Sequence, residues 1–184
     1  MASDSFGGLA SLAPADPMQF TAWLDDALGR PLTIVALRRA SDVGAAGEAR
    51  DASLAAWRTQ LVAYPSVRLL AEELDDESGD EALARITQRD PDVLLVCADA
   101  TSDAAAAGGW CAHILEVAEG LNLFECMLLA RCGVGVTRAN ARAAGYEDGF
   151  SPDQPLADVL AILAREAIAR ETYRRRGSSP PCYL

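Results

Sequence analysis

Apolar residues in this chain follow two alternating patterns, which predict strands separated by helices. Short apolar runs bounded by polar residues, glycine or proline are typical of buried parallel strands, and they occupy residues 32–37, 67–70, 92–97 and 125–130. Residues 145–150 predict a fifth, very short strand or turn. Between and after these runs the sequence predicts helices over residues 48–63, 81–88, 104–119, 137–144 and 156–176.

Strands that alternate with helices imply right-handed crossovers and a single parallel sheet. We therefore predict an α/β fold of the flavodoxin-like (Rossmann-like) type. It has a parallel five-stranded sheet in the order 2-1-3-4-5, with helices on both faces. Ligands of such sheets bind at the carboxyl ends of the strands. The candidate binding loops are therefore residues 38–47, 98–103, 131–135 and 150–155.

The chain divides into four predicted parts: a flexible leader (1–16), an N-terminal helix (17–29), the α/β domain (30–176) and a flexible tail (177–184). In the N-terminal helix, Asp16 is the expected N-cap, Pro17 opens the first turn and Gly29 ends it. Phe20 and Trp23 share its apolar face. We favour packing of this face on the domain itself over docking on a second subunit, because an exposed sheet edge is normally covered.

Composition narrows the class of partner. The formal net charge is −11, and all sixteen basic residues are arginine. A surface this acidic repels phosphate, so the sequence predicts no nucleic-acid partner and no membrane association. Five cysteines without a C-x-x-C pair, together with no apolar run long enough to span a bilayer and no export signal, predict a cytoplasmic protein with reduced thiols.

Four segments carry a resemblance to a known family: residues 92–96, 118–121, 145–150 and 157–159. In order and spacing they resemble the cobalamin-binding domain of the small subunits of lysine 5,6-aminomutase and ornithine 4,5-aminomutase, over roughly residues 30–172. That family binds adenosylcobalamin with a D-x-H-x-x-G motif after the first strand, and the histidine ligates cobalt. A serine after the third strand and a Gly-Gly pair after the fourth make room for the nucleotide tail of the cofactor. A lysine in the helix after the motif forms an imine with pyridoxal phosphate.

The resemblance implies cofactor-binding positions that this sequence fills only in part. Asp42 and Gly47 match the first motif, but Gly44 stands where the histidine should be. Cys97 stands at the serine position with Thr101 beyond it, and the glycine pair reads Cys132-Gly133. The implied cofactor-binding positions are thus Asp42, Gly44, Gly47, Cys97, Thr101, Cys132 and Gly133.

The sequence lacks the chemistry that the family uses. An imine requires a primary amine, and the chain contains no lysine, so no pyridoxal phosphate can be covalently bound by this chain. The only histidine, His113, falls within the predicted helix 104–119 rather than at the strand ends. We therefore expect no catalytic residue and no metal ligand. A cysteine in place of a glycine at position 132 also narrows the space for the nucleotide tail.

Two functions remain open. The first is a degenerate cobalamin-binding-type domain, not catalytic by itself, that acts as a small subunit or accessory protein of an aminomutase-like complex or binds a different ligand at the strand ends. Its expected partner is a larger subunit or a second copy of the chain. The alternative is a cobalamin-binding subunit of an adenosylcobalamin-dependent aminomutase, an isomerase, in which no protein histidine ligates the cobalt.

Simpler interpretations also stand beside these. Gly44 and Gly47 are equally consistent with an ordinary turn before a helix whose N-terminus could bind an anion. Cys97 and Cys132 can be buried apolar residues or a metal or redox pair. The run 72–80 is expected to be a solvated acidic loop. An unrelated receiver or flavin domain is disfavoured, because a receiver requires a lysine and a flavin site usually has flanking aromatic residues.

Overall fold

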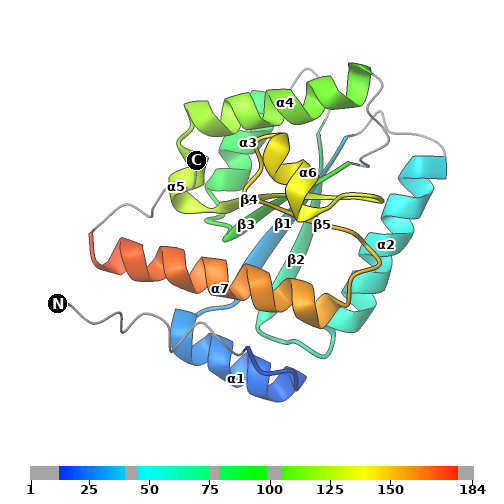
Figure 1. Cartoon of the computed structure of the whole chain (residues 1–184). Coiled ribbons are helices and arrows are strands. Elements are labelled where there is room, and N and C mark those ends of the chain that lie inside the picture. The colour runs from blue at the N-terminus through cyan, green and yellow to red at the C-terminus, as the bar shows by residue number, and fades with distance from the viewer. Residues whose placement is uncertain (1–12, 40–44, 75–78, 99–104, 178–184) are drawn as a thin grey trace.

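The computed structural model describes residues 13–39, 45–74, 79–98 and 105–177, and within them five parallel strands form one sheet in the order β2-β1-β3-β4-β5 (Figure 1). The strands are β1 (Leu32–Arg39), β2 (Val67–Leu74), β3 (Val93–Cys97), β4 (Leu128–Cys132) and β5 (Asp148–Phe150). The helices are α1 (Pro17–Leu28), α2 (Ala45–Leu61), α3 (Gly79–Thr87), α4 (Ala105–Gly120), α5 (Leu123–Cys126), α6 (Arg138–Ala143) and α7 (Leu156–Arg175). The predicted flavodoxin-like class and strand order are confirmed.

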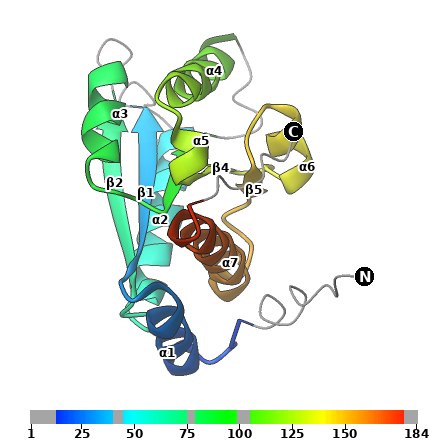
Figure 2. The same cartoon turned by 90° about the vertical axis from the view of Figure 1, so that its left-hand side faces the viewer.

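The sheet is covered on both faces, as its apolar strands require (Figure 2). Alternate side chains of β1 enter different cores: Ile34 and Ala36 face one layer, and Val35 and Leu37 face the other. Helices α1, α2 and α7 complete the first layer, which we call the α2/α7 layer. Helices α3, α4, α5 and α6 complete the second. Such continuous burial explains why the strands contain runs of apolar residues rather than an alternating pattern.

Strands β1 and β2 are longer than predicted and pair along their whole length, from Leu32 opposite Val67 to Arg39 opposite Leu74. The expectation of a solvated loop over residues 72–80 is therefore wrong for its first three residues, which belong to β2, and for its last two, which begin α3, while residues 75–78 lie outside the described structure. Glu72 forms an ion pair with Arg89, and Glu73 forms one with Arg38 at 2.5 Å. These arginines neutralise the negative charges of the two carboxylates, so the strand continues through its acidic residues.

Strand β4 was predicted to cover residues 125–130, and that range is wrong. Asn122 adopts a left-handed conformation (φ 53°), and one helical turn, α5, follows it. The strand then runs from Leu128 to Cys132, in register with Val93 to Cys97 of β3. Pairing with β3 thus sets the limits of β4 and places Arg131 inside the strand.

The N-terminal helix forms as predicted and packs on the domain itself. Asp16 accepts hydrogen bonds from the main-chain N–H groups of Met18 and Gln19, and Gly29 ends the helix with φ 71°. Phe20 and Leu24 are buried in the α2/α7 layer. At the end of α7, Arg175 donates from Nη2 to the carbonyl of Leu28 at 3.2 Å, which joins the first helix to the last.

Three further boundaries bear on the predictions. Helix α2 begins at Ala45. Gly47 was predicted to lie in the loop before this helix, and that prediction is wrong because Gly47 lies within the helix. Thr137 caps α6 in a reciprocal capping box with Asn140, as its position suggested. Most of the predicted leader and of the predicted tail, residues 1–12 and 178–184, lies outside the described residues.

Candidate functional site

The carboxyl end of the sheet is the candidate site, and the structure describes three of the predicted residues there. Cys97 ends β3, Cys132 ends β4, and Gly133 follows directly. Asp42, Gly44 and Thr101 lie outside the described residues. Gly47 lies in the first turn of α2. The structure therefore brings Cys97, Cys132 and Gly133 together and leaves the remaining predicted positions untested.

Cys97 and Cys132 are direct neighbours across two strands. They are register partners, and the N–H of Ala98 donates to the carbonyl of Cys132 at 2.8 Å. Cys132 is in turn the register partner of Phe150 on β5, and the N–H of Gly133 donates to the Phe150 carbonyl at 3.1 Å. Because register partners point to the same face of a sheet, the two thiols and the Phe150 ring form one row across the strand ends. We call Cys97, Cys132 and Phe150 the terminal row.

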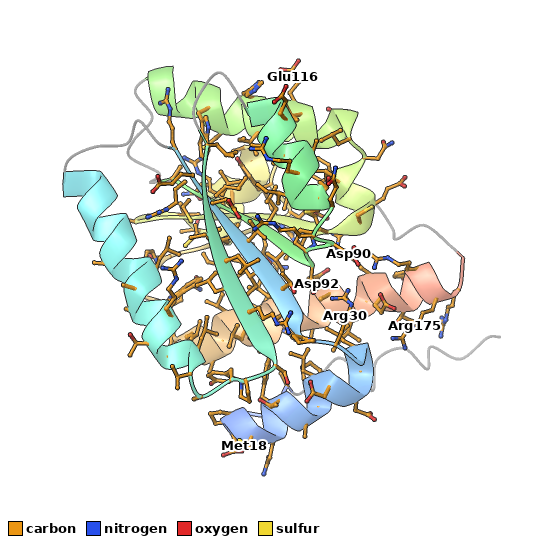
Figure 3. All side chains as sticks on the ribbon, turned by 180° about the vertical axis from the view of Figure 1, so that it is seen from behind. Met18, Arg30, Asp90, Asp92, Glu116 and Arg175 are labelled. Carbon is orange, nitrogen blue, oxygen red and sulfur yellow. The ribbon has the colours of Figure 1, made fainter. Side chains whose placement is uncertain are left out.

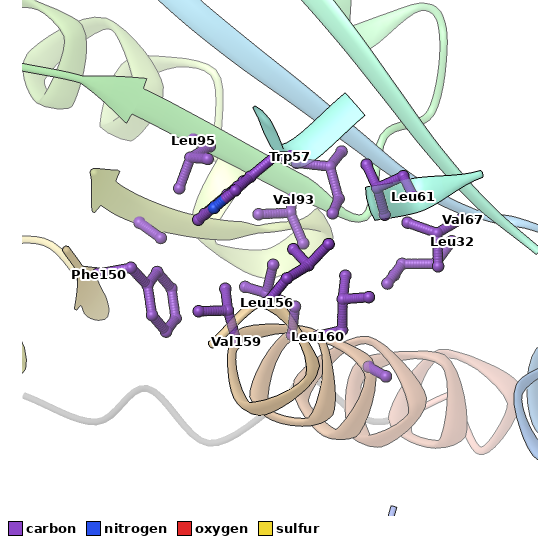
Figure 4. Packing of buried hydrophobic residues seen from close by; sticks show 14 of the residues in the cluster. Leu32, Trp57, Leu61, Val67, Val93, Leu95, Phe150, Leu156, Val159 and Leu160 are labelled. Carbon is purple, nitrogen blue, oxygen red and sulfur yellow. The ribbon is translucent and has the colours of Figure 1, made fainter. Parts of the chain in front are cut away.

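The terminal row is part of the closed apolar layer beneath α2 and α7. Cys97 and Phe150 are each 1% exposed, and Cys132 is 6% exposed. Figure 4 shows the indole of Trp57, from α2, lying over the sheet beside Leu95. In the same view, Phe150 lies beside Val159 of α7. Aromatic and aliphatic side chains therefore fill the space between the strand ends and these two helices.

These residues do not fit a buried cobalamin. In the resembling family, the nucleotide tail needs room beside the serine and glycine positions, and both are occupied here by buried thiols. A tail that carries a phosphate and a sugar would also need polar partners, whereas this layer is lined by apolar side chains. Position 44 carries glycine, which supplies no ligand atom for cobalt. The side chains at positions 97 and 132 are thus buried in apolar packing and offer no polar partner to such a tail.

Two polar groups at this end of the sheet, Arg131 and Ser151, lie in the predicted binding loops 131–135 and 150–155 but were not named as site residues from the sequence. Arg131, in β4, is 8% exposed and points to the face opposite Cys132, toward the side covered by α4 and α6. Ser151, directly after β5, has a buried hydroxyl oxygen with no hydrogen-bond partner among the described residues. The signal for Arg131 was present, since an arginine within an apolar strand run is unusual. It was missed because the predicted strand ended one residue too early.

Residues 145–150, one of the four segments that carry the family resemblance, have structural roles. Gly145 has φ 97°, a conformation that favours glycine. Tyr146 is buried and donates from its hydroxyl to the carbonyl of Cys111 at 3.1 Å, and burial raises the pKa of this phenol. A Cβ added at Gly149 would lie 2.4 Å from Cβ of Ala141, so glycine is required for α6 to pack on β5. These three residues of the segment therefore have packing roles in the fold.

A carboxylate of the same segment, Glu147, stabilises the amino end of the sheet, which is opposite to the candidate site. Glu147 accepts a hydrogen bond from the N–H of Leu129 at 2.9 Å and forms an ion pair with Arg170 of α7. Arg170 also donates to the carbonyl of Phe124. Burial raises the pKa of Glu147, and the nearby Arg170 guanidinium opposes that rise. These contacts join α7 to the starts of β4 and β5.

A second carboxylate fastens the starts of β1 and β3. Asp92 receives two hydrogen bonds from the guanidinium of Arg30, at 2.7 and 2.8 Å, and one from the N–H of Thr33 at 2.9 Å (Figure 3). The hydrogen bond to Asp92 raises the pKa of Arg30. Both Asp92 oxygens are thus bonded in a bidentate ion pair, which is the strongest geometry for these two groups.

The described residues contain no cluster of three or more His, Cys, Asp or Glu side chains that could bind a metal ion. His113 lies within α4, as predicted, and is partly buried. Within the same described ranges, no helix is long and apolar enough to cross a membrane.

No known protein-family profile matches the chain, and no curated protein sequence is significantly similar to it. Solved structures do match its fold. One is the 1.5 Å crystal structure of a novel cobalamin-binding protein from Desulfitobacterium hafniense DCB-2. It superposes with a TM-score of 0.54 at 15% sequence identity, over 82% of this chain and 67% of that chain. At this identity the likeness establishes a shared fold, which is the fold of a cobalamin-binding protein.

Proposed function

We propose that this protein is a degenerate cobalamin-binding-type domain that binds no cobalamin and serves as a non-catalytic small subunit or accessory protein of an aminomutase-like complex in the cytoplasm. The observation that carries the proposal is the terminal row. Cys97, Cys132 and Phe150 are almost completely buried where a cofactor tail would need open space.

The chemistry of the chain supports the same proposal. Cobalt ligation by protein uses an imidazole, and the single histidine lies within α4, away from the strand ends. Imine formation uses a lysine, and the chain has none. A chain that keeps the fold and lacks both groups can contribute surface and stability to an assembly without contributing catalytic groups.

A cofactor titration tests the first half of the proposal. Hydroxocobalamin and adenosylcobalamin are added separately to the purified protein, and the absorbance spectrum is recorded before and after gel filtration. We expect the cobalamin spectrum to remain that of the free cofactor and the cofactor to separate from the protein. A cobalamin-binding domain that carries the motif histidine is the positive control. Stoichiometric cobalamin that stays with the protein would contradict the proposal and favour the alternative, a subunit that binds cobalamin without a histidine ligand.

Co-expression tests the second half. The chain is produced together with the barrel-type large subunit of an aminomutase-like enzyme from the same genome, and the mixture is separated by size. We expect the two chains to elute together without cobalamin bound to this one. Separate elution at micromolar concentrations of both chains would argue against a role in such a complex and would leave the titration result unaffected.

A further inference from the structure

Strand β2 is the outer strand of the sheet, and its outer edge is long and apolar at its centre. Within the described residues, β2 has a ladder with β1 alone. Figure 3 looks onto this edge, and no other described helix or strand passes in front of it. The strand is eight residues long, whereas typical strands have about five or six. Its central residues, Leu69, Leu70 and Ala71, are only partly buried.

The main-chain groups that face outward follow from the pairing with β1. The N–H of Leu32 donates to the carbonyl of Ser66, so the main-chain groups of Ser66 point toward β1. Because these groups alternate along a strand, those of Leu69 and Ala71 point away from the sheet. An unpaired edge of this kind is normally interrupted by proline, a bulge or a central charge. Here the charged residues, Arg68, Glu72 and Glu73, flank the apolar centre instead.

We propose that the outer edge of β2 pairs with the same edge of a second copy of this chain, antiparallel and about a two-fold axis at Leu70. In this register Leu69 opposes Ala71 of the second copy, and their outward main-chain groups exchange hydrogen bonds. Leu70 lies opposite Leu70 of the second copy. Arg68 opposes Glu72 of the second copy, and the two-fold axis repeats this pair of opposite charges.

The charges select this register among those that an antiparallel pairing allows. Side chains directly opposite each other must lie on the same face of the sheet. The residues whose main-chain N–H and C=O groups point away from β1 must also oppose residues of the second copy whose groups do the same. Moving the axis to Ala71 satisfies both conditions but places Leu70 against Glu72 and Leu69 against Glu73, so charges face apolar side chains. The axis at Leu70 instead gives opposite-charge and apolar pairs, which is the self-complementarity that a symmetric interface requires.

The test exchanges the two charges. Arg68→Glu places glutamate against Glu72, and Glu72→Arg places arginine against Arg68, so each variant alone brings like charges together twice. Glu72→Arg also removes the ion pair with Arg89 inside the monomer, so Arg68→Glu carries the main comparison and Glu72→Arg serves to restore the opposite charges. Mixing the two variants restores opposite charges at both positions. Arg68 is exposed, so its replacement leaves the core of the monomer intact. Arg165→Glu, at an exposed position of α7 away from β2, makes the same change in net charge as Arg68→Glu and is the matched control for that variant.

Sedimentation velocity over a concentration series at low salt is the measurement, and circular dichroism verifies that each variant is folded. We expect wild type and Arg165→Glu to dimerise with the same dissociation constant. Each variant at position 68 or 72 should dissociate about tenfold more readily, and an equimolar mixture of the two should recover the dimer. A monomeric wild type would overturn the proposal, as would an Arg68→Glu variant that dimerises like the control. Binding of a different protein to this edge by a monomeric chain would equally overturn it. None of these results bears on whether cobalamin binds.

Discussion

The two ends of the sheet are built from different chemistry. At the amino end, one buried and one partly buried carboxylate accept main-chain hydrogen bonds and pair with arginines: Asp92 with Arg30, and Glu147 with Arg170. At the carboxyl end, the face toward α2 and α7 carries the two thiols and the phenyl ring of the terminal row. Ligands of parallel α/β sheets bind at the carboxyl end.

The contrast separates what builds the fold from what would give it an activity. The polar groups of the amino end are tied to one another and to main-chain groups, so their role is to fix the starts of the strands. At the carboxyl end, on the same face where a cofactor would enter, the polar and small residues of the resembling family are replaced by apolar packing. The residues that determine the fold are therefore visible at the amino end, whereas at the carboxyl end this face of the sheet is closed by apolar packing.

The largest expected effect tests the amino end. Asp92→Ala removes the bidentate partner of Arg30 and the acceptor for the N–H of Thr33, and it leaves the partly buried guanidinium with only the longer ion pair to Glu171 at 4.0 Å. We expect the free energy of unfolding to fall by about 3 kcal/mol, measured by urea denaturation. Asp26→Ala, at an exposed position of α1, should change it by less than about 0.5 kcal/mol. If both variants lost the same small amount, the amino end would not be the stabilising end.

The next effect concerns the packing of α6 beside the strand ends. Gly149→Ala forces a Cβ to within 2.4 Å of Ala141 and 2.7 Å of the Thr137 carbonyl, so the helix must shift. We expect a loss of about 2 kcal/mol in the free energy of unfolding. The matched change Gly109→Ala, in α4 with nothing near the new Cβ, should instead stabilise the protein by roughly 0.5 kcal/mol. A neutral Gly149→Ala would show that α6 is not tightly packed there.

A smaller effect tests the apolar character of the carboxyl end. Cys132→Ser introduces a hydroxyl into the closed layer under α2 and α7, which should cost about 1 kcal/mol of unfolding free energy. Cys126→Ser is the same chemical change at an exposed position and should be neutral. Equal stability of the two variants in thermal and urea unfolding would mean that the terminal row tolerates polar groups, and the argument against a buried cofactor tail would weaken.

The smallest effect is a difference in pH dependence at the amino end. Because burial raises the pKa of Glu147 above its ordinary 4.5, the folded protein takes up this proton before the unfolded chain does. Wild type should therefore gain stability relative to Glu147→Gln as the pH falls from 7 toward 4.5, by less than about 1 kcal/mol. The two proteins are compared by how their free energy of unfolding changes with pH. The absolute difference between them is not used, because it also includes the loss of the ion pair with Arg170 in the variant. Parallel curves for the two proteins would contradict the raised pKa.

Fold class, strand order and most helices could be predicted because they depend on local patterns. The cap at Asp16, the stop at Gly29 and the apolar run before Cys97 are each visible within a few residues. The errors arose where residues distant in the sequence determine where a strand begins or ends. Glu72 and Glu73 remain in β2 because arginines elsewhere pair with them, and β4 extends to Cys132 because β3 extends to Cys97.

The candidate site could be predicted only in part for the same reason. A resemblance in sequence identified Cys97 and Cys132, but their burial depends on Trp57 and α7, which come from other parts of the chain. The segment 145–150 was identified as a family signature. That its residues serve packing became visible only from partners such as Ala141 and Cys111, because a short motif does not reveal what lies against it.

The contact between Arg175 and the Leu28 carbonyl has a consequence for synthesis of the protein. Helix α1 leaves the ribosome well before α7, yet part of the surface that it packs on belongs to α7. Until translation reaches α7, Phe20 and Leu24 lack part of their cover, and a growing chain presents them to chaperones. Nascent chains stopped before α7 should therefore be captured by a chaperone such as trigger factor, and full-length chains should be released.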